Sequence, residues 1–88
     1  MKRKEDFLLQ NVGGQDLLVP TGARVMDMNA LITLNATARR VWELLAEERS
    51  EDYLVDKIVA QFDVDWERAR ADVRIFLKEL GKMGLLEA

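Results

Sequence analysis

The side chains that most often carry acid–base or nucleophilic chemistry are scarce in this 88-residue sequence. It contains no histidine and no cysteine, so no Ser–His or Cys–His pair can form and no imidazole or thiolate can hold zinc. The single serine, Ser50, stands where an amphipathic segment needs a helix cap. Gly13 and Gly14 lack the spacing, the lysine and the following helix of a phosphate loop and are expected to form a hairpin turn. We therefore expect no enzyme activity, no metal site and no cofactor.

Carboxylates and tryptophans are the remaining candidates for a site. The carboxylates gather around one connection between predicted helices, at Glu43, Glu47, Glu48, Glu51 and Asp52. A two-carboxylate active site needs a cleft, which a thin core can hardly provide, so this cluster is expected to be a solvated face. Trp42 and Trp66 could stack a ligand, but both lie on or near apolar helical stripes and are expected to pack in the core.

The first third of the chain is predicted to form strands. Apolar and β-prone runs end at strong turn signals, at Gly13-Gly14 and again at Pro20-Thr21-Gly22. The predicted extended segments are residues 7–12, 16–19, a short piece at 24–28, and 30–34.

The remainder is predicted to form three helices, capped by Asn35, by Ser50 and by Asp63 or Asp65. Apolar residues recur at i, i+3, i+4 and i+7 in each helix. These are Ala38, Val41, Trp42 and Leu45; Val55, Ile58, Val59 and Phe62; and Ala69, Val73, Phe76, Leu77 and Leu80. Gly84 is expected to end the third helix, with residues 85–86 folding back onto the core. With a helix-turn-helix-like corner at residues 62–66, the pattern predicts an α+β, winged helix-turn-helix-like fold.

Length and composition predict one domain over residues 1–88, with residues 1–6 as a flexible N-terminus. No secretory signal or membrane span is visible, and the lack of cysteine fits a reducing compartment, so we expect a cytoplasmic protein without a membrane partner. The net charge of −3 argues mildly against a nucleic-acid partner.

Two features of the predicted surface could bind a partner. Residues 30–34 would form a strand in a small open sheet, whose edge offers unpaired N–H and C=O groups. On the third helix, Ile75 falls off the apolar stripe and shares a flank with Arg68, Asp72 and Glu79. An exposed apolar side chain framed by charges can serve as a docking strip for a peptide, although a single stray surface isoleucine is an equal alternative.

Several short motifs, taken together, resemble those of a known family. They are Leu34-Asn35-Ala36-Thr37-Ala38 followed by Val41-Trp42-Glu43-Leu44-Leu45, then Phe62-Asp63-Val64-Asp65, Asp72-Val73-x-x-Phe76-Leu77-x-x-Leu80 and Gly84-Leu85-Leu86. The strand segment 16–22 fits as well. In this order and spacing they resemble the PqqD-like family, named for coenzyme PQQ synthesis protein D and also called RiPP recognition elements. The resemblance extends from about Phe7 to Leu86.

The resemblance implies a fold and a role. It implies a non-catalytic, chaperone-like adaptor that binds the leader of a ribosomally made precursor peptide and presents it to a modifying enzyme, often a radical SAM protein. The leader is expected to add as a strand to the third strand and to lie against the third helix. Carried onto this sequence, the peptide-binding residues are Ala30, Leu31, Ile32, Thr33, Leu34, Arg68, Asp72, Ile75 and Glu79. Asn35 and Thr37 match the motif and are interpreted as a helix cap and its first turn.

Two other functions remain open from the sequence. A winged-helix DNA-binding regulator is the first alternative, because the third helix carries five basic residues against three acidic ones. The second helix and its flanks are acidic, however, and would face the phosphates in a helix-turn-helix dock. The second alternative is an oligomerisation domain, since open strand edges permit strand exchange within a homodimer.

Overall fold

The computed structural model describes residues 1–5, 7–21 and 32–87, and its chain opens with a β-hairpin. Strand β1 (Phe7–Val12) pairs antiparallel with β2 (Gln15–Pro20). Gly13 and Gly14 have φ angles of 60° and 84°, and glycine adopts such positive angles in a two-residue hairpin turn without steric cost. Strand β3 (Ile32–Leu34) pairs antiparallel with β2, so the sheet order is β1-β2-β3. The predicted extended piece at 24–28 lies outside the described residues.

Three helices follow, as predicted: α1 (Ala36–Leu44), α2 (Glu51–Phe62) and α3 (Trp66–Lys82). Each begins at a polar cap whose side-chain oxygen accepts the N–H of the residue three positions later. The distances are 2.8 Å at Asn35, 3.1 Å at Ser50 and 2.8 Å at Asp65. Asp65 is therefore the cap of α3. Asp63 instead ends α2 in the left-handed conformation, with a φ of 52°.

The C-terminal end of α3 closes with hydrogen bonds that return the chain to the core. Gly84 has a φ of 73°, the Leu85 N–H donates to the carbonyl of Leu80 at 2.9 Å, and the Gly84 N–H donates to Gly81 at 3.2 Å. This pair of bonds is a Schellman motif, which favours glycine at the left-handed position. Leu85 is fully buried and Leu86 is half-buried against the core. The expected return of residues 85–86 is confirmed.

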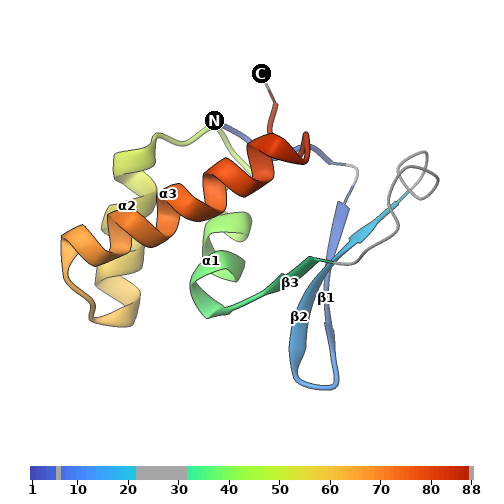
Figure 1. Ribbon diagram of the computed structural model, residues 1–88, viewed down its shortest axis with the longest axis horizontal. Coiled ribbons are helices and arrows are strands. Elements are labelled where there is room, and N and C mark those ends of the chain that lie inside the picture. Colours follow the sequence, from blue (N-terminus) through green and yellow to red (C-terminus); the bar gives the residue numbers. More distant parts are fainter. Residues whose placement is uncertain (6, 22–31, 88) are drawn as a thin grey trace.

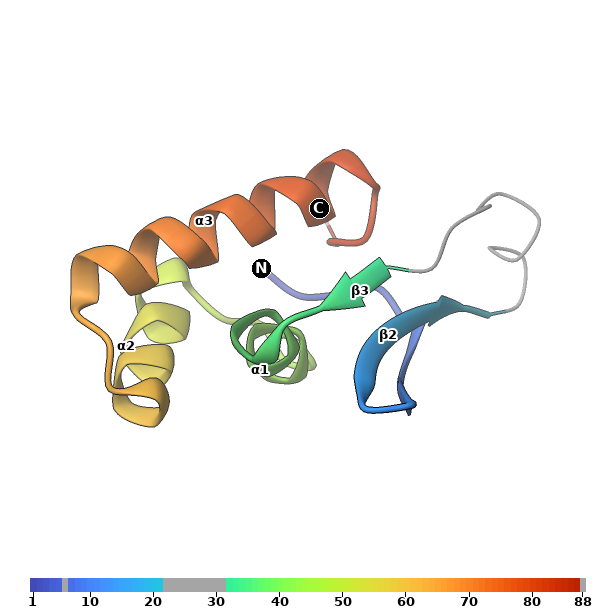
Figure 2. The ribbon, with the colours of Figure 1, turned by 60° about the horizontal axis from the view of Figure 1, so that its bottom comes forward.

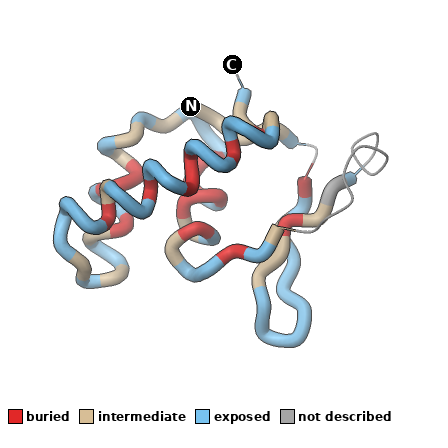
Figure 3. Tube along the Cα trace, viewed as in Figure 1, coloured by how far each residue is buried: buried red, intermediate tan, exposed pale blue. Residues whose placement is uncertain are grey.

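The core lies where the three helical stripes meet the inner face of the sheet (Figure 3). Trp42 is 1% exposed, and its ring meets that of Phe7 edge-on at 6.4 Å between centroids. The prediction for Trp66 was wrong, because its side chain is 39% exposed at the start of α3. Its indole N–H donates to Asp56 at 3.2 Å, and the Arg70 guanidinium lies over the ring, so polar neighbours replace core packing.

The N-terminal residues are bound to the helical part of the molecule, which differs from the flexible N-terminus expected. The Arg3 N–H donates to the carbonyl of Leu45 at 2.9 Å, and the Lys4 N–H donates to Leu85 at 2.8 Å. The Arg3 guanidinium also donates to the Trp42 carbonyl at 2.8 Å. The Arg3 bonds tie the N-terminal segment to the end of α1, and the Lys4–Leu85 bond, with the bridge between Arg3 and Leu86, places it beside the C-terminal segment (Figure 1).

Candidate functional site

A groove of about 370 Å³ lies between β3 and α3. It is lined by Ile32, Thr33, Asn35, Thr37, Ala38, Arg68, Asp72, Ile75, Phe76 and Glu79. Figure 2 shows the arrangement of the elements that supply these residues, with β3 leading directly into α1 and α3 lying alongside both. An edge strand and a helix face therefore share one concave surface.

The helix wall follows from the spacing of its residues. Positions 68, 72, 75 and 79 are three or four residues apart and so lie on one side of an α-helix. The neighbouring stripe, which includes Val73 and Leu80, is buried against α1 and α2. Ile75 is left 60% exposed, while Phe76 is 8% exposed and forms the floor between the core and the groove.

The structure brings most of the predicted peptide-binding residues together. Six of them line the groove: Ile32, Thr33, Arg68, Asp72, Ile75 and Glu79. Leu34 does not, because its side chain is 5% exposed and belongs to the core, so only its backbone is available to a partner. Ala30 and Leu31 lie outside the described residues.

Four further lining residues were expected from the sequence to be purely structural. Asn35 and Thr37 cap and begin α1, and they also line the groove, as do Ala38 and Phe76. Their position follows from the direct passage of β3 into α1, which places the first turn of α1 at the end of the edge strand. In the sequence, the predicted strand at residues 30–34 is followed directly by the predicted helix cap, Asn35. This proximity was the signal from which the first turn of the helix could have been placed at the groove.

The charges on the two sides of α3 have different partners. Within the groove, Arg68 Nε lies 4.0 Å from Asp72 Oδ2, one turn along the helix. Glu79 is exposed and its carboxylate makes no ion pair or hydrogen bond with the described residues. Outside the groove, Arg74 Nε donates to both carboxylate oxygens of Glu51 at 3.0 and 3.1 Å, which ties α3 to α2.

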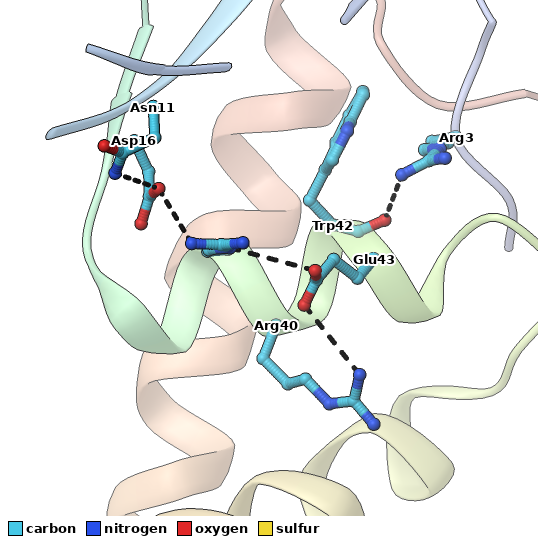
Figure 4. A network of polar contacts seen from close by, with 7 residues as sticks. Arg3, Asn11, Asp16, Arg40, Trp42 and Glu43 are labelled. Atoms are coloured by element: carbon cyan, nitrogen blue, oxygen red, sulfur yellow. Dashed lines mark hydrogen bonds and ion pairs between the residues drawn. The ribbon is translucent and has the colours of Figure 1, made fainter. Parts of the chain in front are cut away.

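A polar network fixes the hairpin on α1 and thereby the position of β3 (Figure 4). Asp16 of β2 accepts hydrogen bonds from Asn11 and from Arg39, each at 3.0 Å. Arg39 and Arg40 both approach Glu43, at 3.7 and 3.8 Å. Because Asp16 is paired opposite Leu34 in the sheet, this network holds the edge strand at the start of α1.

The acidic cluster around the α1–α2 connection contains mostly exposed side chains, as expected. Four of its members make ion pairs: Glu43 with Arg39 and Arg40, Glu47 with Arg49, Glu48 with the N-terminal ammonium, and Glu51 with Arg74. No group of three or more His, Cys, Asp or Glu residues that could hold a metal ion occurs within residues 1–5, 7–21 and 32–87. In the same part of the chain, no helix has the length and apolar character needed to cross a membrane.

Comparison with known proteins gives the chain a family. Residues 17–86 match the family described as coenzyme PQQ synthesis protein D (PqqD). The chain belongs to the PqqD family. This match includes β2, β3 and all three helices, and therefore every described wall of the groove.

Two solved structures resemble the whole chain. One is TbiB1 in complex with the TbiA(beta) leader peptide, with a TM-score of 0.76 and 27% sequence identity over 100% of this chain and 96% of that one. The other is a lasso peptide synthetase B1 complexed with the leader peptide, with a TM-score of 0.73 and 14% identity over 99% of this chain and 96% of that one. The second likeness shows the fold alone. Among curated proteins, none matches this sequence.

Proposed function

We propose that this PqqD-family domain is a non-catalytic adaptor that binds the leader of a ribosomally made precursor peptide and presents it to a modifying enzyme. The leader adds as an extended strand to the open edge of β3 and rests its side chains on the groove face of α3. The observation that carries the proposal is the shared groove, in which an edge strand faces a helix wall with an exposed isoleucine.

The two walls have complementary roles in this mode of binding. Main-chain hydrogen bonds to an edge strand supply affinity for any extended peptide, and pockets for alternate side chains supply selectivity. Thr33 is exposed on the edge strand, and Ile75 and Glu79 are exposed on the helix. Two solved proteins with the same fold were each determined in complex with a leader peptide, which supports a leader over other extended peptides as the occupant of the groove.

The partners and location follow from the same role. The precursor is made on ribosomes, so the cytoplasm is the proposed location. A radical SAM protein is the proposed modifying enzyme. A short peptide gene and a radical SAM gene beside this one would support that choice, whereas a lasso peptide synthetase gene in their place would replace it.

Proline substitutions in β3 test the strand addition. Successive residues of an antiparallel strand turn their N–H groups to opposite edges, so either Ile32 or Thr33 donates to β2 and the other faces the groove. Proline removes the donor. Of Ile32→Pro and Thr33→Pro, one is therefore expected to keep the sheet and lose leader binding, and the other to weaken the sheet.

The measurement is calorimetric titration of both variants with a leader encoded beside the gene, together with amide-shift mapping of the wild-type complex. Thr33→Ala is the matched control, because it removes the side chain and keeps the backbone donor. Shifts that cluster on α1 and α2, with unchanged affinity in both proline variants, would contradict the proposed function.

A further inference from the structure

The groove face of α3 presents an apolar side chain and an acidic side chain at the spacing of a β-strand. Ile75 and Glu79 are separated by one helical turn, which corresponds to a rise of about 6 Å. Two residues of an extended strand advance about 6.6 Å and return to the same face. A strand lying in the groove therefore meets Ile75 and Glu79 with side chains two residues apart.

Glu79 differs from the other charged residues of the groove because its carboxylate has no partner among the described residues. Arg68 and Asp72 lie within 4.0 Å of each other, so a peptide meets them as an approximately neutral pair. The Glu79 carboxylate makes no ion pair or hydrogen bond with the described residues. The ammonium group of Lys82, almost one turn further along α3, makes none with them either. Among the described lining residues, the groove thus carries one uncompensated negative charge, next to an isoleucine that is 60% exposed.

The direction of the peptide follows from the arrangement of the elements. In Figures 1 and 2, β3 runs from the hairpin side toward α1, and α3 runs the opposite way. Both strand pairs of this sheet are antiparallel, and purely antiparallel sheets are favoured over mixed ones. A peptide antiparallel to β3 runs in the direction of α3 and meets Ile75 before Glu79.

From this geometry we infer that the groove selects extended peptides in which an apolar residue is followed, two positions later, by lysine or arginine. The inference rests on the proposed function and specifies the sequence of the leader that this chain binds. Ile75 takes the apolar side chain and Glu79 pairs with the basic one. Arg68 and Asp72 tolerate polar residues nearer the peptide N-terminus.

The test uses a displayed library of random twelve-residue peptides, selected against the wild-type domain and against Glu79→Lys. Wild type is expected to enrich apolar-x-Lys/Arg sequences, and Glu79→Lys is expected to enrich apolar-x-Asp/Glu sequences. Glu67→Lys is the matched control, because it makes the same charge change on α3 outside the groove. It is expected to select the wild-type pattern.

One enriched peptide is then synthesised with lysine and with glutamate at the basic position. The glutamate form should bind the wild type about two- to fivefold more weakly than the lysine form, as expected for an exposed ion pair. It should bind Glu79→Lys more tightly than the lysine form does. The difference should shrink in high salt.

The outcomes separate this inference from the proposed function. Suppose that the selected peptides bind the wild type, lose binding in the groove-facing proline variant, and yet show no preference for a basic residue, or place the basic residue before the apolar one. That result would overturn the inference and leave the proposed function standing. Selected peptides that bind every β3 and α3 variant equally, or a library that yields no binder, would overturn both.

Discussion

The exposed position of Ile75 predicts that its truncation separates binding from stability. Ile75→Ala removes three carbon groups, worth about 0.8 kcal/mol each on full burial, and a bound peptide can newly cover only the exposed 60% of the side chain. The expected loss of binding free energy is therefore about 1.4 kcal/mol, or a roughly tenfold increase in Kd. The free energy of unfolding should change by less than about 0.5 kcal/mol, because this part of α3 faces solvent.

Val73→Ala is the matched control, two residues away on the same helix. Val73 is fully buried, so losing two carbon groups and leaving a small cavity should lower the free energy of unfolding by about 2 kcal/mol. Binding by the folded fraction should be unchanged. The assays are urea unfolding followed by circular dichroism and calorimetric titration with the leader. Wild-type affinity in Ile75→Ala would refute the proposed contact between Ile75 and the leader. A loss of stability equal to that of Val73→Ala would refute the exposed, non-core role of Ile75.

Three further predictions concern the core and the functions that we expect this domain to lack. Trp42→Ala and Phe76→Ala should each lower the free energy of unfolding by about 3–5 kcal/mol, because both residues are at least nine-tenths buried. A wild-type midpoint of urea unfolding in either variant would contradict this packing. The purified domain should retain no stoichiometric metal and should modify no candidate peptide, which elemental analysis and mass spectrometry of the incubated peptide would show. In a gel-shift assay at low ionic strength it should not bind duplex DNA, whereas a salt-dependent shift would favour the winged-helix regulator.

The local elements could be read from the sequence because single residues decide them. Asn35, Ser50 and Asp65 each satisfy an otherwise unpaired N–H at a helix start, and the pair Gly13-Gly14 supplies the two positive φ angles of the hairpin. The off-stripe position of Ile75 likewise followed from helical periodicity, and the structure leaves it exposed. Such features depend on neighbours within a few positions of the chain.

Long-range contacts were harder to predict. Trp66 looked like a core residue from its type and position, but Asp56 and Arg70 give it polar contacts at the surface. Residues 1–6 were expected to be flexible, yet Arg3 donates hydrogen bonds to the carbonyls of Leu45 and Trp42, more than thirty residues away. Neither periodicity nor composition contains the information that these distant residues meet.

The two edges of the sheet are unequal, and this difference explains why β3 is the better candidate for a peptide. The β1–β2 hairpin extends away from the helices in Figures 1 and 2, so the outer edge of β1 has no helix beside it in the described part of the chain. Leu8 and Val12 are about half exposed there, and an edge of this kind can pair with another sheet, as in a strand-exchanged dimer. The edge of β3 instead faces α3 across the groove. A single extended chain is narrow enough to enter between these walls, whereas we expect the edge of a second folded domain to collide with the helix. On the proposed function, α3 would therefore both supply selectivity and restrict the occupant of β3 to a flexible peptide.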